Sequence, residues 1–179
     1  MKKSAQVHKG FTLVELLIVM AIMGILALVV LVIINPLEVT RRGRDSARLA
    51  DLASLQQAIN VAVQEATTSS AEILCSGTTA PCSGSSHTGS RSANGTGWIK
   101  VDLSSNSTMS VAALPIDQTN SSQYHYTYCS DGNAWEINAT LESQQQSGKP
   151  GNDGGNDPAL YEVGSNLGLI ATSGGSCSY

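Results

Sequence analysis

The fold is decided by residues 11–34, which read FTLVELLIVMAIMGILALVVLVII. Twenty-one of these 24 residues are apolar, and the exceptions are Thr12, Glu15 and Gly24. From residue 16 to residue 34 the chain carries no charge over 19 residues, close to the ~20 that cross a hydrocarbon layer about 30 Å thick. The stretch therefore predicts a transmembrane helix near the amino terminus.

The remainder of the chain has a different composition. Over all 179 residues the chain is 41% hydrophobic, 4% aromatic and 13% charged, with a formal net charge of −4. The roughly 145 residues that follow the apolar stretch suffice for one modest domain. Few aromatic side chains and weak acidity are not typical of nucleic-acid-binding proteins, so we expect no specific nucleic-acid partner.

The apolar stretch has simpler readings as a signal peptide or a plain anchor. A signal peptide has an apolar core of about 7–15 residues and a small-residue cleavage site, and neither is present here. A plain anchor fits the length, but Glu15 places a carboxylate inside the stretch. That carboxylate is either a tolerated interfacial residue or the partner of a cation from another chain.

Residues 9–19, KGFTLVELLIV, resemble the amino-terminal signature of type IV pilins and of the pseudopilins of type II secretion. The resemblance extends over about residues 1–65. It implies that residues 1–10 are a leader, which a prepilin peptidase/methyltransferase removes by cleavage after Gly10 before methylating Phe11. Cleavage creates a positive amine one helical turn from Glu15. Glu15 could pair with this amine, or, as the resemblance implies, with the amine of an adjacent subunit during assembly.

The resemblance also implies a function and a location. The chain would be a structural subunit that forms a homopolymer with identical or related pilin subunits, after insertion in membrane lipid and with the help of an inner-membrane assembly machinery. The precursor would span the bacterial inner membrane once with its head outside, and the filament would be extracellular or periplasmic. A major pseudopilin of a type II secretion system is the alternative, and an anchored binding domain that never assembles is a third reading.

Catalytic motifs are missing from the sequence. It has no phosphate-binding Gly-x-x-x-x-Gly-Lys, no His-Glu-x-x-His and no Gly-x-Ser-x-Gly. We therefore expect a protein that is not an enzyme and that requires no cofactor.

Beyond the apolar stretch, residues 35–66 continue as an amphipathic helix, because apolar side chains recur at helical spacing from Leu49 to Ala66. Asn35-Pro36 and Gly43 predict a kink or a locally melted segment at 35–43. Residues 67–179 form the head, with a long Ser- and Gly-rich loop at 67–97. Alternating patterns predict three short antiparallel strands at 98–103, 124–129 and 134–141. The predicted fold is α+β and pilin-like, with the long helix packed on a small antiparallel sheet.

Four cysteines in a domain outside the membrane predict two disulfides with three possible pairings. We favour Cys75 with Cys82, which closes a short loop, and Cys129 with Cys177, which ties the tail to the sheet. A zinc site is the weaker alternative, since no Cys-x-x-Cys occurs.

Two acidic stretches are candidates for a structural calcium ion. The sequence from Leu114 to Asp117 resembles the Leu-Pro-x-Asp loop of major pseudopilins, where the family has a calcium site. Residues 151–157 offer Asp153 and Asp157 on a flexible Gly- and Asn-rich backbone. Turn formation is the alternative role for such residues. The Leu-Pro-x-Asp loop leans toward a pseudopilin, whereas the cysteine-bearing tail leans toward a surface pilin.

Overall fold

A computed structural model describes residues 10–172 and 176–179 of the chain. The elements follow in the order α1 (Leu13–Ile34), α2 (Pro36–Glu65), α3 (Ser70–Leu74), β1 (Cys82–Ser85), β2 (Tyr126–Ser130), β3 (Trp135–Thr140), the 3-10 helix η1 (Pro150–Asn152) and β4 (Leu160–Gly164). The chain divides into two compact units, residues 1–40 and residues 41–179, and each is described by itself. The second unit is called the head below.

The predicted long helix is interrupted at Asn35. Its φ of +46° lies in the left-handed region, and α1 ends there. Pro36 then starts α2, where a proline is tolerated because the first N–H of a helix has no intrahelical acceptor. Gly43, in contrast, lies inside α2 without breaking it. The interruption expected at 35–43 is thus confined to its first residue.

The sheet has four antiparallel strands in the order β1-β2-β3-β4, so the expectation of three strands was wrong. The two central strands match the predicted strand pair closely. β1, with the sequence Cys-Ser-Gly-Ser, lies in the segment expected to be a loop, because serine and glycine have low strand propensity and gave no strand signal.

The structure also corrects the prediction of a strand at 98–103, because this segment is not one of the four strands of the sheet. Its side chains Trp98, Ile99, Val101 and Leu103 are buried, but its backbone bonds to loops, as when Trp98 N–H donates to Ser90 O. A Cβ at Gly84 would lie 2.0 Å from the Trp98 carbonyl oxygen. The segment therefore crosses the face of β1 at a glycine and covers the sheet, and it does not pair along the edge.

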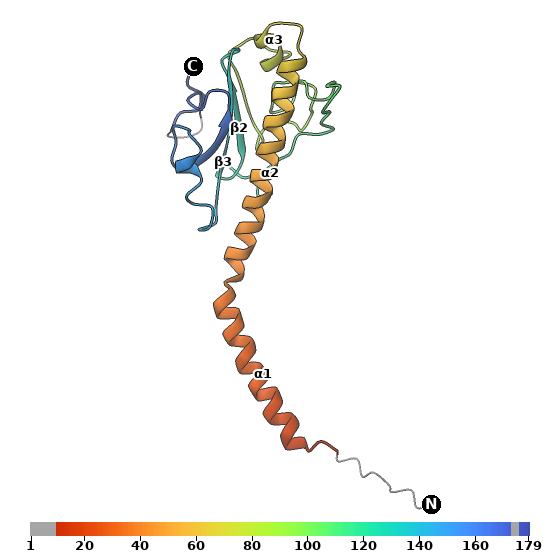
Figure 1. The fold of residues 1–179 in the computed structure, drawn as a ribbon, viewed down its shortest axis with the longest axis vertical. Coiled ribbons are helices and arrows are strands. Elements are labelled where there is room, and N and C mark those ends of the chain that lie inside the picture. The colour runs from red at the N-terminus through yellow and green to blue at the C-terminus, as the bar shows by residue number, and fades with distance from the viewer. Residues whose placement is uncertain (1–9, 173–175) are drawn as a thin grey trace, which may run out of the picture. The chain divides into compact units, whose positions relative to one another are not determined.

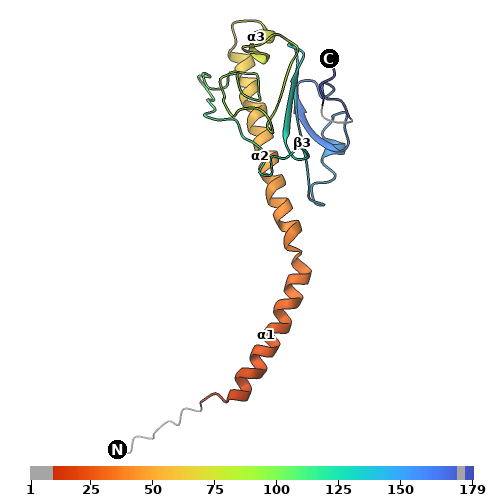
Figure 2. The ribbon, with the colours of Figure 1, turned by 180° about the vertical axis from the view of Figure 1, so that it is seen from behind.

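The core of the head lies between α2 and one face of the sheet. Figures 1 and 2 show β2 and β3 alongside the second half of α2. The helix contributes Leu52, Leu55, Ala58 and Ile59, and the sheet contributes Tyr126, Tyr128, Trp135, Ile137 and Ala139. These contacts confirm the predicted α+β arrangement of a helix on an antiparallel sheet.

Candidate functional site

The predicted cleavage position lies just before α1. Gly10 is exposed, and Phe11 is 82% exposed and outside the helix, which begins at Leu13. A Cβ at Gly10 would meet no atom within 4 Å. An exposed, non-helical peptide bond is the kind that a protease can bind in extended form. The rest of the predicted leader, residues 1–9, lies outside the described residues.

Thr12 and Glu15 form a capping box at the start of α1. The Thr12 N–H and hydroxyl each donate to Glu15 Oε2 at 2.8 Å, and the Glu15 N–H donates to Thr12 Oγ1 at 3.2 Å. A negative side chain in the first turn also opposes the positive end of the helix dipole. Glu15 is therefore stabilised within its own chain, a role that was not predicted. The Thr-x-x-Glu spacing before an apolar stretch was the signal that could have revealed Thr12.

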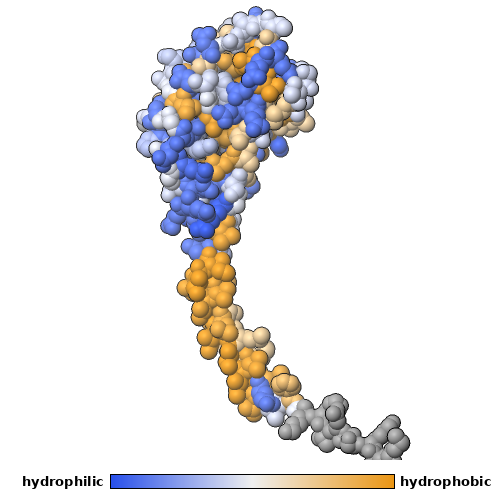
Figure 3. Space-filling model, viewed as in Figure 1, coloured by the Kyte–Doolittle hydropathy of each residue, from blue (hydrophilic) through white to orange (hydrophobic). Residues whose placement is uncertain are grey.

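After Glu15, the surface of α1 is apolar on every side. The helix has 22 residues, so its length is about 33 Å, and none of its side chains is buried. Figure 3 shows hydrophobic residues along the visible face of this helix. By length and composition it could cross a membrane, and among the described residues it is the helix that meets this condition. Together with the sequence motif it fits membrane anchoring, since such a surface needs lipid or protein around it.

A buried ionic cluster joins α2 to the loops of the head. Arg48 is 1% exposed and donates to both oxygens of Asp117, at 2.5 and 3.1 Å. It also donates to Asp45 Oδ1 at 2.8 Å and lies 2.6 Å from Glu142 Oε1. Arg44 binds Glu142 from the more exposed side. Burial disfavours the ionised form of Asp117, but the bonds from Arg48 outweigh it and lower the pKa of Asp117.

The same cluster fixes the chain after β3. Asp45 accepts hydrogen bonds from the backbone N–H groups of Glu142 and Ser143, the latter at 2.7 Å. Burial opposes the charge of Asp45, yet these bonds and Arg48 keep its pKa below the usual value. The cluster thus positions two loops on α2.

Asp117 was predicted as a calcium ligand, and in the structure its carboxylate accepts hydrogen bonds from Arg48. Its Oδ1 also accepts from the N–H groups of Thr119 and Asn120. Both oxygens of Asp117 are therefore bound to donors, and the carboxylate acts as a structural acceptor.

Asp153 and Asp157 lie apart from Asp117, next to Glu162. Asp153 accepts from the N–H groups of Gly155 and Glu162, and Asp157 accepts from Ala159 N–H. These are turn contacts, the alternative role expected for such residues. Among residues 10–172 and 176–179, no group of three or more His, Cys, Asp or Glu side chains is arranged to hold a metal ion. In the structure all three carboxylates accept structural hydrogen bonds.

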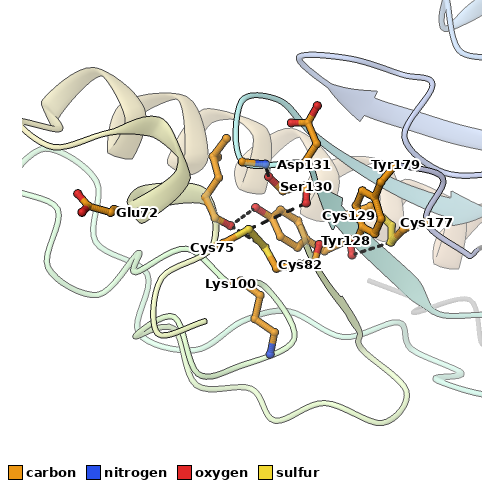
Figure 4. Close-up of a disulfide and its surroundings, with 12 residues drawn as sticks. Glu72, Cys75, Cys82, Lys100, Tyr128, Cys129, Ser130, Asp131, Cys177 and Tyr179 are labelled. Atoms are coloured by element: carbon orange, nitrogen blue, oxygen red, sulfur yellow. Dashed lines mark hydrogen bonds between the residues drawn. A yellow bond between two sulfur atoms is a disulfide. The ribbon is translucent and has the colours of Figure 1, made fainter. Parts of the chain in front are cut away.

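The four cysteines form the two favoured pairs, Cys75–Cys82 and Cys129–Cys177, with Cα–Cα distances of 5.8 and 5.7 Å. Figure 4 shows Tyr128 between them, and its hydroxyl donates to Leu74 O at 2.6 Å. The second disulfide closes 48 residues and the first only 7. Because each disulfide lowers the entropy of the unfolded chain, the second stabilises the head by about 4 kcal/mol and the first by about 2.5 kcal/mol. The tail is thus fastened to β2 by the more stabilising bridge.

A family profile described as the prokaryotic N-terminal methylation motif matches residues 6–34. The comparisons with curated proteins and with solved structures give no match. The matched residues contain the exposed Gly10–Phe11 bond, the capping box and the whole of α1. Residues 6–34 therefore carry a type IV pilin-like or pseudopilin signature, and the chain has the α+β layout of a pilin-like fold.

Proposed function

We propose that the chain is the precursor of a structural subunit of a type IV pilus-like filament. Cleavage after Gly10 and methylation of Phe11 would produce the mature subunit, which would assemble through α1. The observation that carries the proposal is the exposed Gly10–Phe11 bond directly before a capped helix that is apolar except for Glu15 and has no buried side chain. Before assembly lipid would cover this helix, and afterwards neighbouring helices would do so.

The capping box is compatible with a second role for Glu15 in assembly. Both bonds from Thr12 reach Oε2, which leaves Oε1 to accept a donor from another subunit. A neighbouring Phe11 amine would supply that donor together with a positive charge. In the low dielectric of a filament core, an unpaired amine or carboxylate is costly, so the pair would fix the register between subunits.

The partners follow from this proposal. They are further copies of the chain or related subunits, a prepilin peptidase/methyltransferase, and an assembly machinery in the inner membrane. The head would lie outside the cytoplasm, where its two disulfides are stable. The filament would then be extracellular for a pilus or periplasmic for a secretion apparatus.

A pseudopilin of type II secretion is the second candidate. The Leu114–Asp117 sequence favours it, although Asp117 is bound to Arg48 here. The disulfide-bonded tail favours a surface pilin, since a filament exposed to the exterior gains from a cross-linked head. We give precedence to the pilus on this ground.

Deletion of the protein in its natural host separates the two candidates. For a pilus subunit, electron microscopy should show the loss of long surface filaments, while the amounts of secreted proteins in the medium stay at wild-type levels. Reintroduction of the full-length chain should restore the filaments. If the surface filaments remain and exported proteins accumulate in the periplasm, the pilus assignment is wrong and the pseudopilin candidate replaces it.

A further inference from the structure

The sheet face that points away from α2 carries buried carboxyl groups. On β3 the side chains of Trp135 and Ile137 enter the core against α2, and Glu136, between them, points to the opposite face. Glu162 of β4 shares this opposite face. Glu136 is 0% exposed, because the C-terminal segment of residues 165–172 covers it, and Glu162 is 2% exposed, because the loop at 153–157 packs against it. Two buried carboxyl groups need an explanation.

The two carboxyl groups are close neighbours on adjacent strands. Glu136 pairs with Gly164 and Asn138 pairs with Glu162, so the glutamates occupy diagonal positions on one face. Gly164 has no side chain, which leaves space between them. A Cβ at Gly155 would lie 1.7 Å from Glu162 Oε2, so only glycine allows the loop to pass this closely. The packing therefore holds Glu162 against Glu136.

Each carboxyl group uses one oxygen to hold the backbone. Glu136 Oε2 accepts from the N–H groups of Leu169 and Ile170, at 2.8 and 2.9 Å. Glu162 Oε2 accepts from Asp157 N–H at 3.1 Å. The other oxygen of each, Oε1, is buried with no hydrogen-bond partner among the described residues. Two neighbouring acceptors that both lack a donor are satisfied by one hydrogen placed between them.

The groups that face this pair are mostly acidic. Asp153 and Asp157 lie beside Glu162, and their charges disfavour its ionised form. Lys149 lines a cavity of about 500 Å³ together with Asp153 and Glu162. His125 lines a second cavity, of about 300 Å³, with Asp157. Glu162 thus has three acidic neighbours, Glu136, Asp153 and Asp157, and Lys149 lines the adjacent cavity.

The elements that cover Glu136 add no charge. The outward side chains of β2 are Thr127 and the disulfide-bonded Cys129. The sequence from Ser165 to Thr172 has no ionisable side chain. Two ionised carboxylates would therefore repel each other without a cation inside the covered face.

We propose that Glu136 and Glu162 share one proton in the folded head, and that this proton holds residues 165–172 on the sheet. We call the pair and its contacts to Leu169 and Ile170 the carboxyl latch. When the proton is lost, two adjacent negative charges lie under residues 165–172, and their repulsion separates this segment from β3. The Cys129–Cys177 disulfide keeps the opened segment tethered. The latch therefore opens locally and reversibly as the pH rises.

The pH range follows from the electrostatics of the pair. Burial, and next the adjacent carboxyl group of Glu162, raise the pKa of Glu136 to about 8, and burial also raises the pKa of Glu162. In the unfolded chain both groups ionise near 4.5. Between about pH 5 and pH 8 the folded head thus binds one more proton than the unfolded chain. The contribution of this pair to the stability of the head is highest below this range, falls as the pH rises through it and levels off above it.

The test compares the wild type with Glu136→Gln, using the full-length oxidised chain in detergent micelles. In the variant, the amide oxygen can accept from Leu169 and Ile170, and the amide nitrogen can donate to Glu162 Oε1 at any pH. Urea unfolding is followed by the fluorescence of Trp98 and Trp135, which are both buried in the head. From pH 5 to pH 8, the unfolding constant of the wild type relative to that of the variant should rise by up to about tenfold per pH unit. Glu72→Gln, at an exposed carboxyl in α3, should follow the wild type.

A second measurement locates the change. Hydrogen-exchange protection of the Leu169 and Ile170 amides should fall between pH 6 and pH 9 in the wild type and stay constant in Glu136→Gln. If Glu136→Gln does not fold, Glu162→Gln provides the same comparison, since its amide can accept from Asp157 and donate to Glu136. Equal pH dependence in wild type and variant overturns the proposal. It is also overturned if 1 mM calcium or magnesium at pH 8 restores the stability measured at pH 5, because a cation would then take the place of the proton.

Discussion

Filament formation is expected to disappear when Glu15 is replaced by valine, while cleavage after Gly10 continues. Valine suits an apolar helix and removes the carboxylate that would meet the amine of a neighbouring subunit. A loss of about 1.4 kcal/mol of binding free energy weakens the contact between two subunits about tenfold, and a filament repeats that contact at every subunit. Breaking a buried charge pair costs more free energy, about 3–5 kcal/mol. Filament yield should therefore fall below detection in sheared-cell preparations.

Cleavage should be unaffected because the Gly10–Phe11 bond lies outside α1, before the capping box. Immunoblots of membranes should show the mature size for Glu15→Val in wild-type amounts. Glu72→Gln is the matched control, since it removes an exposed carboxylate of the head and should leave both cleavage and filaments intact. Normal filaments from Glu15→Val would show that the carboxylate serves only to cap its own helix.

Replacement of Arg48 by methionine is expected to destabilise the head by about 3–5 kcal/mol. Methionine fills a similar volume but leaves Asp117 buried without its cation, and it also removes a charge beside Asp45 and Glu142. The backbone N–H groups bound to Asp45 and Asp117 compensate only part of this loss. Urea unfolding at pH 7, followed by tryptophan fluorescence, measures the change.

Arg44→Met is the matched control for Arg48→Met. The Arg44 side chain is 27% exposed and binds one carboxylate, Glu142, so solvent screens the pair. Its removal should destabilise the head much less than the removal of Arg48. If Arg48→Met and Arg44→Met lower the free energy of unfolding by the same small amount, the buried ionic cluster is not the main connection between α2 and the loops of the head.

Local patterns predicted the elements whose signal lies in their own residues. The apolar stretch gave α1, and the alternation around Tyr126, Tyr128 and Ile137 gave β2 and β3. The disulfide pairing was favoured because Cys75 and Cys82 close a short loop and because Cys129 and Cys177 tie the tail to the sheet. In each case, short-range periodicity or spacing and the final packing agree.

The features that were missed depend on contacts distant in the chain. The sequence pattern around Trp98 predicts a strand, but the backbone of Trp98 packs on the face of β1 at Gly84 and does not pair along the edge of the sheet. The ion pair of Asp117 with Arg48, 69 residues earlier, has no local signal in the sequence. Glu136 alternates as a solvent-facing residue, yet the C-terminal segment covers it. A single sequence does not show such partners, because a charged side chain has the same local pattern whether it meets water, a cation or a proton.

The amino-terminal segment and the head have different physical requirements. All side chains of α1 are uncovered within the chain, so that helix depends on lipid or on other subunits. The head has its own core, two disulfides and a buried ionic cluster. This division suits a protein whose first helix exchanges lipid for protein during assembly while its head stays folded.

The most direct test of the central claim is the intact mass of the chain after expression in membranes with a prepilin peptidase. We predict a protein that begins at Phe11, carries one methyl group on its amino terminus and retains both disulfides. Expression without the peptidase should yield the chain that begins at Met1. An unprocessed Met1 chain in the presence of an active peptidase would contradict the account, because neither the exposed Gly10–Phe11 bond nor the capped helix would then serve assembly.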